Sequence, residues 1–166
     1  MKDFKNDIKL ARKGDTDAFA RLYTIVYKQM YHTALYNLRN EHDACDAVSE
    51  AVIDAFASIK NLKNEDAFKS WIMKILFTKI KRRQKEYINS SGELSEETKT
   101  EEFEFQNAEL KQALEMLDND SRAILSLSVL GGYNSEEISK IFGMKASSVR
   151  SRLARIKEQL RINLTV

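Results

Sequence analysis

The stretch Tyr133–Leu160 constrains the fold most, because its residues predict two helices joined by a tight turn. Asn134 and Glu137 have the spacing of a capping box, so we expect a helix to begin directly after the asparagine. Gly143 is expected to end that helix, since glycine adopts the left-handed conformation at little cost. A second helix should follow, with Ser147–Ser148 accepting hydrogen bonds from its free N-terminal amides.

The second of these helices has two contrasting faces. Its apolar residues recur at steps of four, three and four, namely Val149, Leu153, Ile156 and Leu160. At about 100° per residue, the opposite face is small, polar and basic, and it comprises Ser147, Arg150, Ser151, Ala154 and Arg155, with Arg152 and Lys157 on its flanks. Such a helix suits the major groove of DNA. The clustered arginines and the short turn favour a helix-turn-helix over an ordinary basic surface helix that ends a bundle.

The absence of proline and the presence of only five glycines in 166 residues predict an all-α protein of one or two small domains. The single cysteine, Cys45, excludes an intramolecular disulfide and fits a reducing compartment. No apolar run reaches the roughly 18 residues of a membrane span, and the N-terminus is too charged for a signal peptide. We therefore expect a cytoplasmic protein without direct membrane insertion. The 27 basic and 25 acidic residues nearly cancel, so only their distribution is informative.

A short helical pattern at the N-terminus ends before Gly14, and three longer patterns follow it. Asp15 is positioned to cap the first of these, which runs to about Leu38. Its apolar stripe comprises Phe19, Leu22, Tyr23, Val26, Met30, Ala34 and Leu38. The aromatic residues spaced at four along this helix indicate a bundle core with a tyrosine edge rather than a surface for stacking bases.

Two more helices are expected over about 43–59, beginning at Asn40 or Asp43, and over about 65–87. The predicted apolar face of the first comprises Cys45, Val48, Val52, Phe56 and Ile59. The second should pack through Phe68, Trp71, Ile72 and Ile75. Its predicted outward line comprises Ser70, Lys74, Phe77 and Lys81.

The charges on these two helices are segregated by sign. The first has an acidic stripe that spans about 80° of the helix surface and comprises Asp43, Asp46, Glu50 and Asp54. Like charges at this spacing repel, so the stripe is either a solvated face or a docking surface for a basic partner. The second helix has seven basic residues between Lys69 and Lys85. This run favours phosphate binding over a purely structural role at a helix C-terminus.

Residues 89–105 contain six glutamates and no helical apolar stripe, which predicts a flexible acidic linker. Helical patterns return after it and continue into the helix-turn-helix. The sequence therefore predicts two small helical domains, over 1–88 and 106–166, each stabilised by packing of three or four helices.

Four blocks of this chain resemble the compact, extracytoplasmic-function type of sigma factor in the sigma-70 family. They are GDTDAFARLY (14–23), DACDAVSEAVIDAFASI (43–59), FKSWIMKI (68–75) and GYNSEEISKIFGMKASSVRSRLARIKEQL (132–160). The blocks occur in the family's order and spacing, and together they cover nearly the whole chain. The resemblance implies sigma domain 2 over 1–88 and sigma domain 4 over 106–166. It further implies binding to core RNA polymerase and recognition of promoter DNA, with no enzyme activity and no cofactor.

The resemblance also implies roles for individual residues. The residues expected to bind polymerase are Asp46, Ser49, Glu50 and Asp54. Binding of the minus-ten promoter element falls on Lys60, Asn61, Lys63, Asn64, Lys69, Lys74 and Lys81, and the 60–66 segment corresponds to the loop that captures a flipped base. Binding of the minus-thirty-five element falls on Ser147, Ser148, Arg150, Ser151, Arg152 and Arg155. The chain departs from the family at Phe77–Thr78, where the family usually has Arg-Asn. An anti-sigma factor is an expected further partner.

Other classes of function account for less of the sequence. A dimeric helix-turn-helix regulator leaves the acidic stripe and the 60–66 loop unexplained, and the basic face disfavours an interaction scaffold that has lost DNA binding. His32 and His42 lack the spacing of catalytic or metal-binding residues, and no phosphate-binding glycine loop is present. His42 and Cys45 provide too few ligands for a metal site. We therefore expect no metal and no small-molecule substrate.

Overall fold

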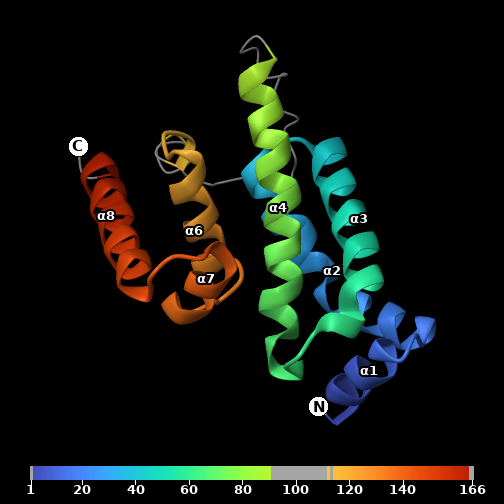
Figure 1. Ribbon diagram of the computed structural model, residues 1–166. Coiled ribbons are helices and arrows are strands. Elements are labelled where there is room, and N and C mark those ends of the chain that lie inside the picture. Colours follow the sequence, from blue (N-terminus) through green and yellow to red (C-terminus); the bar gives the residue numbers. More distant parts are fainter. Residues whose placement is uncertain (1, 91–111, 113, 165–166) are drawn as a thin grey trace. The chain divides into compact units, whose positions relative to one another are not determined.

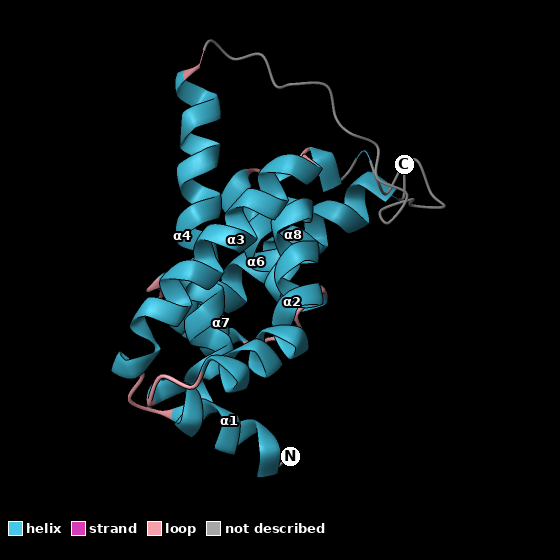
Figure 2. Cartoon of the chain, turned by 90° about the vertical axis from the view of Figure 1, so that its right-hand side faces the viewer, coloured by secondary structure: helices cyan, strands magenta, loops and turns pink. Residues whose placement is uncertain are grey.

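The computed structural model describes residues 2–90, 112 and 114–164, and every regular element in that part of the chain is a helix (Figures 1 and 2). The chain divides into two compact units, residues 1–97 and 98–166. The all-α prediction is confirmed. The predicted linker lies outside the described residues from position 91 onward. No helix in the described ranges is long and apolar enough to cross a membrane.

The first unit is a helical bundle in which α2, α3 and α4 contact one another pairwise and α1 packs against α2. Two short 3₁₀ helices, η1 and η2, connect α3 to α4. The bounds are α1 Lys2–Arg12, α2 Thr16–Leu38, α3 Glu41–Ser58, η1 Ile59–Asn61, η2 Glu65–Ala67 and α4 Phe68–Asn89.

The starts of α2 and α3 follow from side-chain caps that the sequence predicts. The Asp15 carboxylate accepts a hydrogen bond from the Ala18 amide at 3.0 Å. Gly14, in the turn between α1 and α2, has a φ of 98°, which glycine adopts easily. The Asn40 side chain accepts a hydrogen bond from the Asp43 amide at 3.0 Å. These hydrogen bonds confirm Asp15 as the cap of α2. They also show that Asn40, rather than Asp43, caps α3.

The buried face of α3 consists of small residues, which corrects the predicted one. Ala44, Ala47, Ala51 and Ala55 are each 0% exposed, and Val48 is buried beside them. Cys45 and Phe56 are exposed and Val52 is half-buried, although the prediction placed all three in the core. The prediction weighted large apolar side chains, whereas α3 contacts both α2 and α4, so its sandwiched face is filled by alanines.

The interior face of α4 includes Phe77, which the sequence prediction placed on the outward line. Phe77 is 2% exposed. The residues buried with it on this helix are Phe68, Ile72, Met73, Leu76 and Ile80. This is a wider face than the predicted one, and Trp71 and Ile75 lie at its half-buried edge. Phe77 therefore contributes to packing, and the position cannot contact DNA in this fold.

The second unit contains α6 (Asn119–Val129), α7 (Ser135–Phe142) and α8 (Ala146–Leu164). Helix α8 contacts both α6 and α7. Leu117, Leu125 and Ile156 form a buried cluster, with Leu114 and Leu160 packed against it. Val149 is 0% exposed, so the predicted apolar stripe of α8 does face the interior.

The predicted turn between α7 and α8 is present, with one difference in how α8 begins. Asn134 and Glu137 form the capping box, with hydrogen bonds of 2.9 and 3.1 Å, and Gly143 ends α7 with a φ of 67°. Helix α8 begins at Ala146, so Ser147 and Ser148 lie in its first turn and are exposed rather than acting as caps. Their hydroxyls therefore point outward from the start of the helix.

In the turn between α6 and α7, the Tyr133 ring packs closely against the backbone at Gly131. The Tyr133 amide donates to the Leu127 carbonyl at 3.0 Å, and the Tyr133 side chain is only 7% exposed. A Cβ atom at Gly131 would lie 2.6 Å from the Tyr133 ring and 2.8 Å from the Leu127 oxygen. Only glycine fits there, because the second neighbour is backbone that cannot move aside freely.

We predict that Gly131→Ala destabilises the second unit by about 1–3 kcal/mol, the usual cost of overpacking. Circular dichroism during thermal unfolding measures this loss. Gly132→Asn is the matched control, because the space around Gly132 is open and asparagine tolerates its φ of 67°. Trp71, the sole tryptophan, lies in the first unit, so its fluorescence transition should not shift. Equal stability of the Gly131→Ala and control variants would contradict the close contact.

We predict that the second unit loses stability at alkaline pH through Tyr133. Burial, aided by the negative charge of Glu137, raises the pKa of Tyr133 to about 12, whereas an unfolded tyrosine has a pKa of about 10. The contribution of Tyr133 to the free energy of unfolding is therefore complete below pH ~10. It is lost as the pH rises through the folded pKa, and the total loss is about 2–3 kcal/mol. Denaturant titrations across this range should show a smaller alkaline loss in Tyr133→Phe. An equal loss in both proteins would contradict the assignment.

Candidate nucleic-acid and protein interfaces

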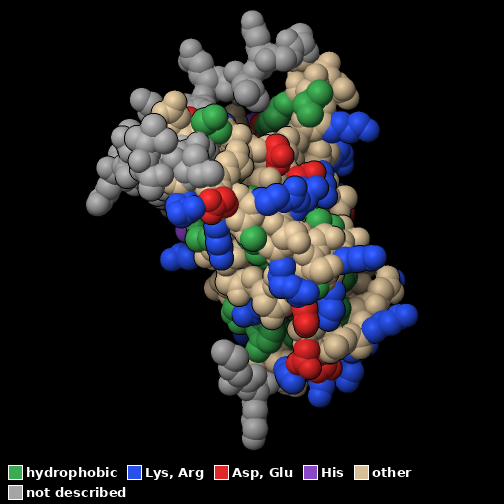
Figure 3. All heavy atoms as spheres, turned by 90° about the vertical axis from the view of Figure 1, so that its left-hand side faces the viewer, with side chains coloured by type: hydrophobic (Ala, Val, Ile, Leu, Met, Phe, Trp, Pro, Cys, Tyr) green, Lys and Arg blue, Asp and Glu red, His purple; other side chains and the backbone are tan. Residues whose placement is uncertain are grey.

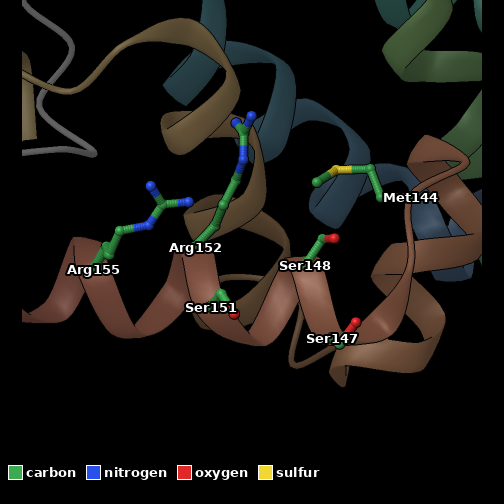
Figure 4. Close-up of a pocket in the computed structure, with 6 residues that line it drawn as sticks. All are labelled: Met144, Ser147, Ser148, Ser151, Arg152 and Arg155. Atoms are coloured by element: carbon green, nitrogen blue, oxygen red, sulfur yellow. The ribbon is translucent and has the colours of Figure 1, made fainter.

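The start of α8 carries an open hollow of about 390 Å³ on its exposed side (Figure 4). It is lined by Met144, Ser147, Ser148, Ser151, Arg152 and Arg155. Five of these belong to the set predicted to bind the minus-thirty-five element. Arg150, the sixth member of that set, is exposed but does not line the hollow. The structure thus brings together serine hydroxyls and two guanidinium groups, the donors that suit phosphate oxygens and base edges.

Arg152 and Arg155 differ in their surroundings, although both side chains rise from the same side of α8 (Figure 4). Arg152 is half-buried and lies 3.9 Å from the carboxylate of Asp120 at the start of α6. Arg155 is exposed. An arginine that already faces a carboxylate is partly neutralised and held in place. Arg155 is therefore better suited to contact a base, and Arg152 to contact the backbone.

Figure 3 views the molecule from the side on which α8 lies in Figure 1, and Lys and Arg side chains protrude at several places on that face. Acidic groups lie beside some of them. On the coloured part of this face, basic side chains are therefore interspersed with acidic ones.

The acidic stripe of α3 lies against the basic end of α4 for most of its length. Glu50 accepts hydrogen bonds from Arg82 and, at 2.7 Å, from Arg83. Asp54 pairs with Lys79, and Asp43 lies 3.7 Å from Arg83. The sequence left this stripe as either a solvated face or a docking surface for a basic partner, and it favoured phosphate binding for the basic run. In the structure, Asp43, Glu50 and Asp54 instead pair with Lys79, Arg82 and Arg83 of that run.

The remaining exposed ridge of α3 is less acidic than the sequence suggested. The Asp46 carboxylate lies 3.4 Å from exposed His42, and Ser49 is exposed beside it. Ile53 is 67% exposed and Phe56 is 43% exposed on the same side of the helix. The sequence reasoning missed these two residues. Had the alanines been assigned to the core, the opposite face would have shown Ile53 at the centre of the exposed side.

The stretch from η1 to the start of η2 presents its polar residues outward. The residues Lys60, Asn61, Lys63 and Asn64 are exposed, whereas Leu62 between them is 5% exposed. The Asn64 side-chain oxygen accepts a hydrogen bond from the Asp66 amide at 3.0 Å, so this oxygen is already engaged in capping η2. Asn61 is therefore the better candidate to hydrogen-bond a base through both its donor and its acceptor.

Three lysines of α4 are expected to bind DNA, and each is exposed. They are Lys69, Lys74 and Lys81. The Lys69 amino group lies over the ring of Phe4 at 5.7 Å, which fixes it beside the loop. Within the described ranges, no group of three or more His, Cys, Asp or Glu side chains is arranged to hold a metal ion. The first unit thus offers a surface for polar and ionic recognition.

We predict that Glu50→Lys destabilises the first unit by about 1–2 kcal/mol, because it removes one part-buried and one exposed ion pair and places a third cation beside Arg82 and Arg83. Asp46→Lys is the matched control and should change stability by less than about 0.5 kcal/mol. Trp71 fluorescence in denaturant titrations measures both. Equal stability of the two variants would mean that the pairs of Glu50 with Arg82 and Arg83 do not contribute to the fold.

Comparisons with known proteins give one family match within each compact unit. Residues 22–86 match the family model described as sigma-70 region 2, and residues 107–160 match that of sigma-70 region 4. RNA polymerase sigma factor SigV of Bacillus subtilis is 27% identical over 161 residues, which cover 94% of this chain and 97% of the relative. The ECF RNA polymerase sigma-E factor of Escherichia coli K12 is also 27% identical and covers 92% of this chain and 90% of the relative.

Two solved structures share the fold, each with a TM-score of 0.73. One is CnrH in complex with the cytosolic domain of CnrY, at 17% identity and covering 98% of this chain and 97% of CnrH. The other is the sigma factor RpoE of Bartonella quintana in complex with the anti-sigma factor NepR, at 22% identity and covering 89% of this chain and 97% of RpoE. Since both conserved regions match in order and the relatives match over nearly their whole length, this chain belongs to the sigma-70 family and is an RNA polymerase sigma factor of the extracytoplasmic-function type.

Proposed function

We propose that this sigma factor docks on core RNA polymerase through the exposed ridge of α3. The ridge combines Asp46 and Ser49 with the apolar side chains of Ile53 and Phe56, all accessible on one side of the helix. An apolar centre with a polar edge is the usual composition of a protein interface. Glu50 and Asp54 lie at the border of this ridge, and they take part only if a basic group of the polymerase shares them with α4.

The two units recognise two promoter elements in this proposal. The loop over 60–66 and the exposed lysines of α4 bind the minus-ten element, and α8 binds the minus-thirty-five element in the major groove. The domain limits that we propose are 1–88 and 106–166, with 89–105 between them. The first assignment is supported by the row of exposed polar residues from η1 to the start of η2. The second is supported by the serine- and arginine-lined hollow.

We further propose an anti-sigma factor as a regulatory partner. The support is that the two solved structures described above are complexes, one with the anti-sigma factor NepR and one with the cytosolic domain of CnrY. The protein itself has no enzymatic activity in this proposal, since its role is to direct the polymerase. It acts where the polymerase acts, which is in the cytoplasm.

The observation that carries the proposal is that one chain combines an exposed, partly apolar ridge on α3 with two separate polar and basic surfaces suited to DNA. Run-off transcription with purified core polymerase, on the DNA upstream of the protein's own gene, tests it directly. We expect a discrete transcript only when this protein is added. If a core enzyme that is active with another sigma factor gives no transcript on this DNA, the proposed promoter function is wrong.

We predict that the arginines of α8 have separable roles. Arg155→Ala should relax preference at one promoter position by about 1–3 kcal/mol, the value of a base contact. Arg152→Ala should weaken binding to all DNA sequences equally. It should also lower the slope of log affinity against log salt concentration by about one. Selection from a library of upstream promoter sequences at fixed salt measures the preference.

Arg161→Ala is the control for the two arginine variants. Arg161 lies further along the same helix and hydrogen-bonds Glu158 at 2.6 Å, so its removal should leave the preference unchanged. A uniform loss of affinity in Arg155→Ala, without any change of preference, would mean that this residue contacts the backbone and that sequence is recognised elsewhere.

A further inference from the structure

The N-terminal helix α1 packs against both short helices that frame the 60–66 loop. It contacts η1 on one side of the loop and η2 on the other. Ile8 and Ala11 on its inner face are 0% and 1% exposed, and Ile59 and Leu62 of the loop segment are 2% and 5% exposed. The apolar base of the loop is therefore covered from the side of α1.

Polar and aromatic contacts join the same elements. Lys5 pairs with Asp66 at 3.0 Å, and Arg12 lies 3.8 Å from Glu65. The ring of Phe4 meets that of Phe68 edge to face, with centroids 5.7 Å apart, and it also lies beneath the Lys69 amino group. Both acidic residues of η2 thus face a cation from α1, and the first turn of α4 is held by the same helix.

Helix α1 is itself fixed to the bundle. The Arg21 side chain on α2 donates two hydrogen bonds to one carboxylate oxygen of Asp7, at 2.8 and 3.2 Å, and a third to the other oxygen at 3.2 Å. Asp7 is only 7% exposed, and the hydrogen bond from Arg21 lowers its pKa. A bidentate pair restricts orientation as well as distance, so the pair holds α1 in a defined orientation on α2.

These contacts leave one side of the loop anchored and the other side open. The open side presents Lys60, Asn61, Lys63 and Asn64. Extrusion of a base from the DNA stack is unfavourable, and ordering a mobile loop at the same moment would add a further entropic cost. A loop that is already ordered avoids this second cost.

We propose that α1 is a positioning element, which holds the 60–66 loop in the conformation that accepts an unstacked promoter base. Lys5 and Arg12 have a second effect, because they cancel carboxylate charges at Asp66 and Glu65 that would repel the DNA backbone. The proposal rests on the promoter function above and extends it to residues of a helix that lies outside the matched sigma-70 region 2.

Two measurements on the full-length protein test this role. Hydrogen exchange of residues 59–67 in the free protein reports the order of the loop without any DNA. Opening of a promoter with 2-aminopurine in its minus-ten element, by holoenzyme at equal core occupancy, reports function. The variants are Arg12→Glu, which reverses one charge of the support, and Phe4→Leu, which keeps an apolar side chain but removes the ring contacts.

Two further variants separate positioning from general charge. Lys9→Glu makes the same charge change on the exposed side of α1, so it controls for weaker attraction to DNA. Arg12→Glu combined with Glu65→Arg restores both the net charge and the pair. We expect Arg12→Glu and Phe4→Leu to speed loop exchange and to reduce promoter opening about fivefold, the effect of losing one ion pair or one set of ring contacts. Lys9→Glu should match the wild type, and the double variant should recover most of the opening.

The failures of the two proposals are distinguishable. If the wild type and all variants open the promoter equally and exchange their loop amides at equal rates, α1 is not a positioning element. If the wild-type holoenzyme leaves the promoter closed, the proposed promoter function is wrong. If the double variant stays as defective as Arg12→Glu, the Arg12–Glu65 pair does not hold the loop.

Discussion

The first unit depends on the close packing of α3 through its alanine face. Because Ala44, Ala47, Ala51 and Ala55 have short side chains, α3 fits between α2 and α4 and contacts both. That packing rotates the large apolar residues of α3 to one flank and its acidic residues to the other. The acidic flank then meets the basic end of α4, and the exposed ridge left over is the one suited to a partner. A bulkier interior face would separate the helices and remove this arrangement.

Much of the fold was predictable from local signals, because those signals act over a few residues. Asp15, Asn134 and Gly143 were assigned correctly from capping and turn chemistry. The errors arose where tertiary packing decides. Phe77 was placed outward because its helix has apolar residues on more than one side, and only the bundle shows which sides are covered.

The candidate sites were predictable in composition but not in pairing. The exposed residues of the 60–66 loop and of α8 follow from polarity and from the family resemblance. The ion pairs of Glu50 with Arg82 and Arg83 join residues about thirty positions apart, and no local pattern indicates that two helices cross with these faces opposed. The support of the loop by α1 is non-local in the same way, since Lys5 and Arg12 contact Asp66 and Glu65.

The central claim is that two surfaces of one chain contact two promoter elements, and site-specific photocrosslinking tests it most directly. A crosslinker at Asn61 and another at Ser147 place a probe on each exposed surface. The account predicts that the Asn61 probe labels the minus-ten element only after the strands separate. It predicts that the Ser147 probe labels the minus-thirty-five element in both closed and open complexes. Labelling of the upstream duplex by the Asn61 probe, or no labelling by either probe in an active holoenzyme, would contradict it.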